Sequence, residues 1–260
     1  MSHYTIGNDE IDRLVEKYKQ ENQEKIVAFI DVLGFKEKVK NDDRSLKLFA
    51  VNLCHYIDKN YEKIDIAMFS DSMYLLCDKK DFNEILEFIS YLQYRLLFFN
   101  EECCLNGEPP KRSLYLLRGA ITMGNVFRLK EDDILFGKAV VRAYELESKE
   151  AKMPGIIFDK EKLAEVESKY TKWAVLRNMV EEMEDDVLCF DYIKYIFEKN
   201  IEIGEDQRKS LYETISYEKE KLAEMESGEK QKIMEKLEYF ENYIKNSIKK
   251  QRDDDIVGGC

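Results

Sequence analysis

The chain has 260 residues, of which 44% are hydrophobic and 36% charged, so a sizeable core can form beneath a well-solvated surface. The formal net charge of −12 excludes a general surface for nucleic acids or anionic membranes. Any phosphate-bearing ligand must therefore be small and held by local cations or a metal. No apolar run approaches the roughly 20 residues of a membrane-spanning helix, and the polar N-terminus is unlike a signal peptide. We expect no nucleic-acid partner and no membrane association.

The six cysteines form no C-x-x-C pair and mostly lie in apolar contexts: Cys54, Cys77, Cys103, Cys104, Cys189 and Cys260. This distribution is typical of free thiols, most of them buried, in a reducing compartment rather than of a disulfide framework. The sequence therefore predicts a soluble, cytoplasmic protein.

Hydrophobic periodicity predicts alternating strands and helices over the first 160 residues. The predicted elements in chain order are a polar helix at 1–24, a strand at 26–32, a helix at 46–57, strands at 64–69 and 73–77, a helix at 82–96, a strand at 113–122 that ends at Gly124, a hairpin or strand pair at 126–136, a helix at 138–150 and a strand at 156–158. This β-α-β-β-α-β order with additions predicts an α+β fold, a ferredoxin-like palm.

From about residue 160 the composition shifts to Glu, Lys and Tyr. We therefore expect an N-terminal polar helix (1–24), a palm domain (25–160) and a mostly helical C-terminal extension (161–260). The extension has two predicted helices, at 206–226 and 230–251. The second helix carries an apolar stripe with near-heptad spacing, formed by Ile233, Leu237, Phe240, Ile244 and Ile248. Packing on the same chain and contact with a second subunit both remain open for this stripe.

Two aspartates are the main candidates for a functional site, and the predicted order of strands places them close to each other. Asp31 follows an apolar strand, and Asp71 lies in the predicted hairpin Ser70-Asp71-Ser72. A buried carboxylate is costly without a cation, and carboxylates on neighbouring strands repel each other. A shared divalent ion would relieve both penalties, and oxygen ligands suit Mg²⁺ or Mn²⁺. The simpler alternatives are a capping or salt-bridged Asp31 and a plain turn residue at Asp71.

Four segments in a fixed order resemble motifs of class III nucleotidyl cyclases. Residues 29–35 (Phe-Ile-Asp-Val-Leu-Gly-Phe) resemble the first metal-binding strand, in which Gly-Phe begins three residues after an Asp. Residues 69–72 (Phe-Ser-Asp-Ser) resemble the hairpin Gly-Asp that supplies the second metal position. Residues 117–124 (Leu-Arg-Gly-Ala-Ile-Thr-Met-Gly) resemble an Arg-x-Gly-Ile-His-x-Gly strand. Residues 137–148 resemble the Gly-x-x-Val-Asn-x-Ala-x-Arg-x-Glu helix that follows it. The match covers roughly residues 25–150.

The resemblance implies a cyclisation in which the ribose 3′-hydroxyl attacks the α-phosphorus and pyrophosphate leaves. It implies two Mn²⁺ or Mg²⁺ ions per site, held by Asp31, Asp71 and the backbone carbonyl of Ile30. One ion lowers the pKa of the hydroxyl, and the other neutralises the triphosphate. The stretch through Phe35 can lend backbone N–H groups to phosphate oxygens at a helix start.

Further candidates for substrate binding come from the strand and helix motifs. We expect Arg118 to touch the nucleotide through base or phosphate, with a strand-end salt bridge as the alternative. Lys138 and Arg142 are candidates for binding the triphosphate, with a solvated helix face as the alternative. Tyr74 could stack on a base, although strand tyrosines more often serve packing.

The departures from the family pattern reduce the range of nucleotides that the chain could use as a substrate. Purine cyclases of this class read adenine with a Lys and an Asp, at positions that Ala67 and Ile134 occupy in this chain. Neither residue can make the polar contacts that specify adenine. The family's transition-state Asn and Arg fall on Val141 and Glu145. The chain is therefore either a non-catalytic cyclase-like protein or a cyclase for another nucleotide.

The second alternative brings a closer resemblance. The Ile-Asp-x-Leu-Gly-Phe opening, the Ser-Asp-Ser hairpin, the Arg-Gly strand and the Gly-Lys-Ala…Ala-Tyr-Glu-Leu-Glu helix resemble the Pycsar pyrimidine cyclases. These bacterial antiphage enzymes convert UTP or CTP to 3′,5′-cyclic UMP or cyclic CMP, which activates an effector. The resemblance implies a homodimer with active sites at the interface and an effector linked only through the product.

Two other hypotheses remain beside a pyrimidine cyclase. One is a dimeric cyclase-like module that binds a nucleotide or a partner without turnover, which Val141 and Glu145 favour and the intact aspartates oppose. The other is a different palm-type two-metal enzyme. The sequence has no Gly-Gly-Asp/Glu-Glu-Phe hairpin, which argues against a diguanylate cyclase.

Overall fold

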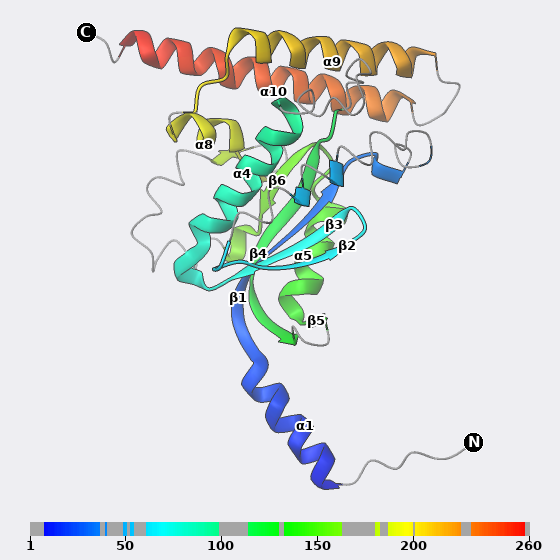
Figure 1. Cartoon of the computed structure of the whole chain (residues 1–260), viewed down its shortest axis with the longest axis vertical. Coiled ribbons are helices and arrows are strands. Elements are labelled where there is room, and N and C mark those ends of the chain that lie inside the picture. The colour runs from blue at the N-terminus through cyan, green and yellow to red at the C-terminus, as the bar shows by residue number, and fades with distance from the viewer. Residues whose placement is uncertain are drawn as a thin grey trace.

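The structure is a computed structural model of the chain. It describes residues 8–36, 40, 49–50, 53–54, 61–98, 114–129, 133–162, 180–182, 187–199, 201–224 and 230–257. A twisted sheet forms the centre of the molecule (Figure 1). Helix α1 (Asn8–Glu21) extends away from one end of it, while α9 (Glu205–Ala223) and α10 (Lys230–Val257) lie side by side at the other end.

The sheet confirms the predicted α+β palm. The described strands are β1 (Asn22–Val32), β2 (Asp65–Phe69), β3 (Ser72–Cys77), β4 (Leu117–Leu129), β5 (Ile134–Phe136), β6 (Gly155–Phe158), β7 (Val180–Glu182) and β8 (Leu188–Phe190). Their order is β2-β3-β1-β4-β6-β8-β7, with β5 paired to β4. β1 pairs antiparallel with β3 and β4, and β4 pairs parallel with β6. The four neighbouring strands β2-β3-β1-β4 form the ferredoxin-like unit of the sheet.

Helices cover the sheet as hydrophobic periodicity predicts. Besides α1, α9 and α10, the main helices of the described chain are α4 (Phe82–Phe98), α5 (Lys138–Lys149) and the short α8 (Tyr192–Glu198), with a 3₁₀ turn η1 (Lys79–Asp81) before α4. Most of the helix expected at 46–57 lies outside the described residues. Of its apolar positions, Phe49, Ala50 and Leu53 are described and helical; Phe49 and Leu53 are buried, whereas Ala50 is exposed.

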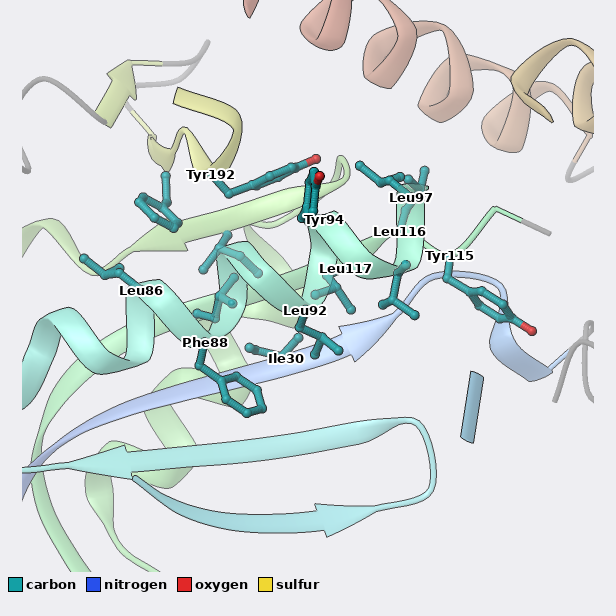
Figure 2. Close-up of a cluster of buried hydrophobic side chains, with 14 of the residues drawn as sticks. Ile30, Leu86, Phe88, Leu92, Tyr94, Leu97, Tyr115, Leu116, Leu117 and Tyr192 are labelled. Atoms are coloured by element: carbon teal, nitrogen blue, oxygen red, sulfur yellow. The ribbon is translucent and has the colours of Figure 1, made fainter. Parts of the chain in front are cut away.

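Side chains of β1 alternate between two faces of the sheet, because successive residues of a strand point to opposite sides. Ile26, Ala28, Ile30 and Val32 join the large apolar core that α4 covers. Figure 2 shows Ile30 in this core beside Leu92 of α4 and Leu117 of β4. Val27 and Phe29 belong to a smaller cluster under α5, so Asp31, which shares their side of β1, lies on the α5 face.

The C-terminal extension packs on the same core. Leu237, Phe240, Ile244 and Ile248 of α10 are buried within the cluster that includes β1 and α4. This packing favours the first of the two alternatives for the apolar stripe, contact within its own chain. The hydroxyl of Tyr243 donates a hydrogen bond to Asp191 at 2.7 Å, at the start of α8, and accepts one from the N–H of Ile193 at 3.2 Å. The extension also adds β7 and β8 to the sheet, which the sequence pattern did not predict.

Two predicted boundaries are wrong. The helix expected at 1–24 ends at Glu21, because residues 22–24 pair with β4 as the start of β1. The strand expected to end at Gly124 continues to Leu129 as β4. A Cβ at Gly124 would lie 3.4 Å from the Cβ of Ala139, so the glycine allows α5 to approach the strand closely. Gly124 therefore marks helix–strand packing and not the end of the strand.

The remaining sequence expectations concern thiols and membranes. Cys77 and Cys189 are buried free thiols, as predicted, whereas Cys54 is exposed. Cys103, Cys104 and Cys260 lie outside the described residues. Within the described ranges, no helix has both the length and the apolar character needed to cross a membrane.

Candidate active site

The β2–β3 hairpin places Asp71 at its tip. Phe69 pairs with Ser72, so Ser70 and Asp71 form a two-residue turn. Ser70 has a φ of 59°, a left-handed conformation that a non-glycine residue adopts at a cost of about 1 kcal/mol. A positive φ at the first turn residue suits the twist of a hairpin, which is why glycine is preferred there. The strained serine thus occupies the glycine position of the Gly-Asp motif.

Asp31 lies next to this hairpin. The Oγ of Ser72 donates a hydrogen bond to Oδ1 of Asp31 at 2.9 Å. Burial raises the pKa of the Asp31 carboxyl, and the charge of Asp71 raises it further. The Ser72 hydrogen bond and the Arg118 charge oppose this rise without cancelling it. The two aspartates are therefore near enough to repel each other, as the strand order predicts.

Among the described residues, Arg118 is the cation that forms an ion pair with Asp31. The two residues are directly paired across β1 and β4, and Nη2 of Arg118 lies 3.6 Å from Oδ2 of Asp31. The same Nη2 forms an ion pair with Oε1 of Glu147, a buried residue of α5. Two carboxylates (Asp31 and Glu147) thus share one guanidinium, and Asp71 is near enough to act on Asp31, so negative charge is in excess among these described side chains.

This excess of carboxylate fits a divalent cation that is shared with a substrate. Within the described ranges, no cluster of three or more His, Cys, Asp or Glu side chains could hold a metal ion by itself. Mg²⁺ is commonly bound by only one or two carboxylates together with substrate phosphates. Asp31 and Asp71 match that donor set, and Ile30 lies beside them in β1, paired with Met73 and Gly119.

Tyr74 lies on the α5 face two residues beyond Ser72. Its ring packs against Phe29 with a centroid distance of 4.8 Å, and Tyr144 of α5 also packs against Phe29, with a centroid distance of 5.6 Å. Burial raises the pKa of the Tyr74 hydroxyl, and the nearby Tyr144 and Glu147 add to this effect. Tyr74 is therefore a half-buried residue that packs beside the carboxylates. Its stacking on a base remains a prediction.

The structure does not bring the helix cations to Asp31. Arg142 forms two hydrogen bonds with buried Asp159, at 3.0 and 3.3 Å, and Thr122 donates a third to the same carboxylate at 2.7 Å. Burial alone would raise the pKa of Asp159, but these bonds outweigh it and leave the pKa below its usual value. Lys138 is exposed at the first turn of α5.

The segment after Asp31 combines a buried aromatic side chain with an exposed glycine. The ring of Phe35 is buried and packs against Phe49 with a centroid distance of 5.1 Å. Gly34 is exposed and has a φ of +73°. Phe35 therefore anchors the turn by its side chain, and a phosphate contact would have to come from its backbone N–H.

The positions that differ from purine cyclases are apolar or used elsewhere. Ala67 is paired with Tyr74 across the hairpin, and Ile134 is exposed on β5. Val141 is 57% exposed on α5. Glu145 pairs with Lys149 at 3.1 Å on the same helix. Three of the four residues have no polar side-chain group that could replace the missing adenine readers. The fourth, Glu145, has its carboxylate paired with Lys149.

Sequence reasoning missed two residues of this constellation, Ser72 as a partner of Asp31 and Glu147 as a partner of Arg118. A signal for Glu147 was present, since it follows Ala139, Val140, Ala143 and Leu146 at helical spacing. A carboxylate on the apolar face of a helix indicates a buried cationic partner. Ser72 gave no comparable signal, because serine is an ordinary hairpin residue.

No protein-family model and no curated protein matches the chain. Solved cyclase structures resemble it at low identity. The adenylyl cyclase CyaB from P. aeruginosa is 15% identical, with a TM-score of 0.44, covering 65% of this chain and 93% of its own. A monomeric guanylyl cyclase domain of the RhoGC fusion protein from the aquatic fungus Blastocladiella emersonii is 14% identical, with a TM-score of 0.48, covering 65% and 97%. The guanylyl cyclase Cya2 is 14% identical, with a TM-score of 0.44, covering 65% and 90%. Similarity at this level carries no conclusion about activity or substrate.

Proposed function

We propose that the protein is a metal-dependent pyrimidine nucleotide cyclase, which converts UTP or CTP to the 3′,5′-cyclic monophosphate and pyrophosphate. The observation that carries the proposal is the convergence of Asp31 and Asp71 beside Arg118 at the end of β1. Burial and mutual repulsion of two carboxylates are unfavourable for stability, and a bound cation removes this penalty. The sequence motifs that resemble class III cyclases lie on these same elements.

Each residue has a distinct task in this reaction. Asp31 and Asp71 would hold the cations, with the carbonyl of Ile30 as a further ligand, and the hydrogen bond from Ser72 fixes the orientation of Asp31. When bound, the two ions, Mn²⁺ or Mg²⁺, lower the pKa of the ribose 3′-hydroxyl and neutralise the triphosphate. The guanidinium of Arg118 lies beside this position and can donate to a phosphate or to the base. Lys138 and the backbone N–H groups near Phe35 remain candidates for the outer phosphates, while Arg142 would first have to leave Asp159.

Exposed apolar residues support a homodimer with the active sites at the interface. Phe69, next to the Asp71 turn, is 87% exposed, and Met68 beside it is 41% exposed. Val141 and Tyr144 of α5 are also exposed. Large apolar side chains gathered around polar groups are typical of protein interfaces. A second copy that covers the hairpin would exclude water from the aspartates.

The choice of a pyrimidine follows from what is missing. Ala67 and Ile134 lack the polar groups that would specify adenine, and a site discriminates strongly only where it hydrogen-bonds to the substrate. The same motifs resemble the Pycsar cyclases. We therefore infer a role as a second-messenger synthase in bacterial antiphage defence, with an effector that responds to the cyclic nucleotide.

The alternative is a dimeric cyclase-like module that binds a nucleotide or a partner without turnover. Val141 and Glu145 favour it, because the side chains that stabilise the transition state in purine cyclases are absent there.

Product analysis separates these functions. Purified wild type and Asp71→Ala are incubated with each of the four NTPs and Mn²⁺, and the products are resolved by chromatography. We expect a cyclic pyrimidine nucleotide from wild type only. Nucleotide binding without product would support the module, and a linear or dinucleotide product would indicate another palm enzyme.

A further inference from the structure

Glu147 occupies a position on α5 where a charged side chain is costly. Its carboxylate is buried on the helix face that otherwise consists of small and aliphatic residues: Ala139, Val140, Ala143 and Leu146. Among the described residues, its ion-pair partner is Arg118 of β4. An isolated carboxylate in such surroundings would be strongly unfavourable. The pair with Arg118 therefore accounts for the presence of this charge beneath the helix.

The Nη2 atom of Arg118 is shared between two carboxylates. Glu147 makes the closer contact, and Oδ2 of Asp31 lies 3.6 Å away. This order is unexpected, because Asp31 and Arg118 are directly paired residues on neighbouring strands. Opposite charges in such cross-strand pairs attract each other. Glu147 thus keeps the guanidinium of Arg118 away from Asp31, the partner that the strand pairing favours.

We propose that Glu147 is a positioning residue, which keeps Arg118 from closing onto Asp31 and leaves this carboxylate available to a divalent cation. The inference rests on the proposed function, since it takes Asp31 and Asp71 as cation ligands. A guanidinium in full contact with Asp31 would occupy the oxygens that a metal ion needs.

The same contact leaves part of Arg118 unsatisfied. Its Nε is buried and has no acceptor within the described part of the chain. A buried donor without an acceptor is unfavourable. Glu147 therefore holds one edge of the guanidinium while the Nε donor is left without a partner.

The test is a double-mutant cycle on Mn²⁺ binding to the full chain without nucleotide, measured by electron paramagnetic resonance. We expect Glu147→Gln to weaken Mn²⁺ binding by about ten- to a hundred-fold. This is the range typical of residues that orient metal ligands without contacting the metal themselves. In an Arg118→Gln background the same change should have no effect, because no guanidinium remains to be held back. Glu145→Gln is the matched control, since Glu145 lies on the same helix and pairs with Lys149 instead.

Each contrary outcome has a definite meaning. Equal weakening in both backgrounds would assign Glu147 a purely structural role and overturn the inference, as would unchanged binding in Glu147→Gln. The double variant replaces the ion pair by two neutral amides, so it leaves no buried charge unpaired. Wild type that binds no Mn²⁺, or that binds it equally after Asp71→Asn, would overturn the proposed cation site and the inference with it.

Discussion

The two faces of the central sheet differ in chemistry although the same strands form both. One face is continuously apolar, with Ile26, Ala28 and Ile30 of β1 packed against α4 and, through the same core, the C-terminal helices. The other carries Asp31, Arg118 and Thr122 between two small apolar clusters under α5. Apolar burial stabilises at about 25 cal/mol per Å² without regard to direction, whereas a buried charge needs a partner in the right place. The first face therefore supplies stability, and the second supplies fixed charges.

Replacing one carboxylate of the charged face has the largest expected effect. Asp71→Asn should lower cyclase activity by about a thousandfold or more, because bound ions supply several kcal/mol of transition-state stabilisation. The free energy of unfolding should change by less than about 0.5 kcal/mol, as is usual for a substitution away from packed contacts. Rates with the best NTP and urea unfolding measure the two quantities.

Asp133→Asn is the matched control for that variant, since Asp133 is an exposed turn residue that pairs with Arg128. It should retain full activity. Equal loss of activity in both variants would contradict a special role for the hairpin aspartate.

Truncation on the apolar face should act on stability alone. Phe240 of α10 is fully buried, so Phe240→Ala should lower the free energy of unfolding by about 3–5 kcal/mol. Mn²⁺ affinity below the unfolding temperature should be unchanged. A separate early transition, with the sheet left as stable as before, would show that α10 is not part of the common core.

Two carboxylates on the charged face should respond to pH in opposite directions. The pKa of Asp159 is lowered in the folded state, so its contribution to stability is present at neutral pH and is lost as the pH falls through that pKa. The pKa of Asp31 is raised, so its contribution is present in acid and is lost as the pH rises through that pKa.

Asp159→Asn should therefore destabilise the metal-free protein by about 1–2 kcal/mol at pH 7, and Asp31→Asn should stabilise it by about 1 kcal/mol. Both differences should shrink as the pH falls below about 4. Urea unfolding at neutral and acid pH gives the comparison. Destabilisation by Asp31→Asn at pH 7 would mean that Arg118 already satisfies this carboxylate without a metal.

The smallest expected effect concerns the polar contact beneath the C-terminal helices. Tyr243→Phe removes the hydroxyl between Asp191 and Ile193 and should cost about 1 kcal/mol, or about 2–4 °C in Tm. Tyr217→Phe on exposed α9 serves as the control and should leave Tm unchanged. Equal Tm values for both variants would indicate that α10 is held by apolar packing alone.

Much of the ferredoxin-like unit could be predicted from the sequence, because its strands and helices have unambiguous periods. The run at 26–30 is apolar throughout, and the Ser-Asp-Ser segment separates two short strands that pair as expected. β7 and β8 could not be predicted, since each has three residues and β7 contains Glu181 and Glu182. Such short strands exist through pairing with the sheet and not through their own pattern.

The candidate site was predictable where it depends on strand order and unpredictable where it depends on side-chain partners. Strand order places Asp31 opposite Arg118 and next to the hairpin of Asp71. Sequence alone does not indicate that Arg142 bonds to Asp159, because residues 17 positions apart meet only when β6 returns beside β4. The Glu147 contact likewise depends on how α5 lies across β4.

The most direct test of the central claim is a competition assay. Wild-type protein is incubated with an equimolar mixture of ATP, GTP, CTP and UTP in the presence of Mn²⁺, and cyclic products are identified by mass spectrometry. Our account predicts cyclic CMP or cyclic UMP as the main product, with none after chelation of the metal or in Asp71→Asn. Cyclic AMP or cyclic GMP as the main product, or no cyclic nucleotide at all, would contradict it.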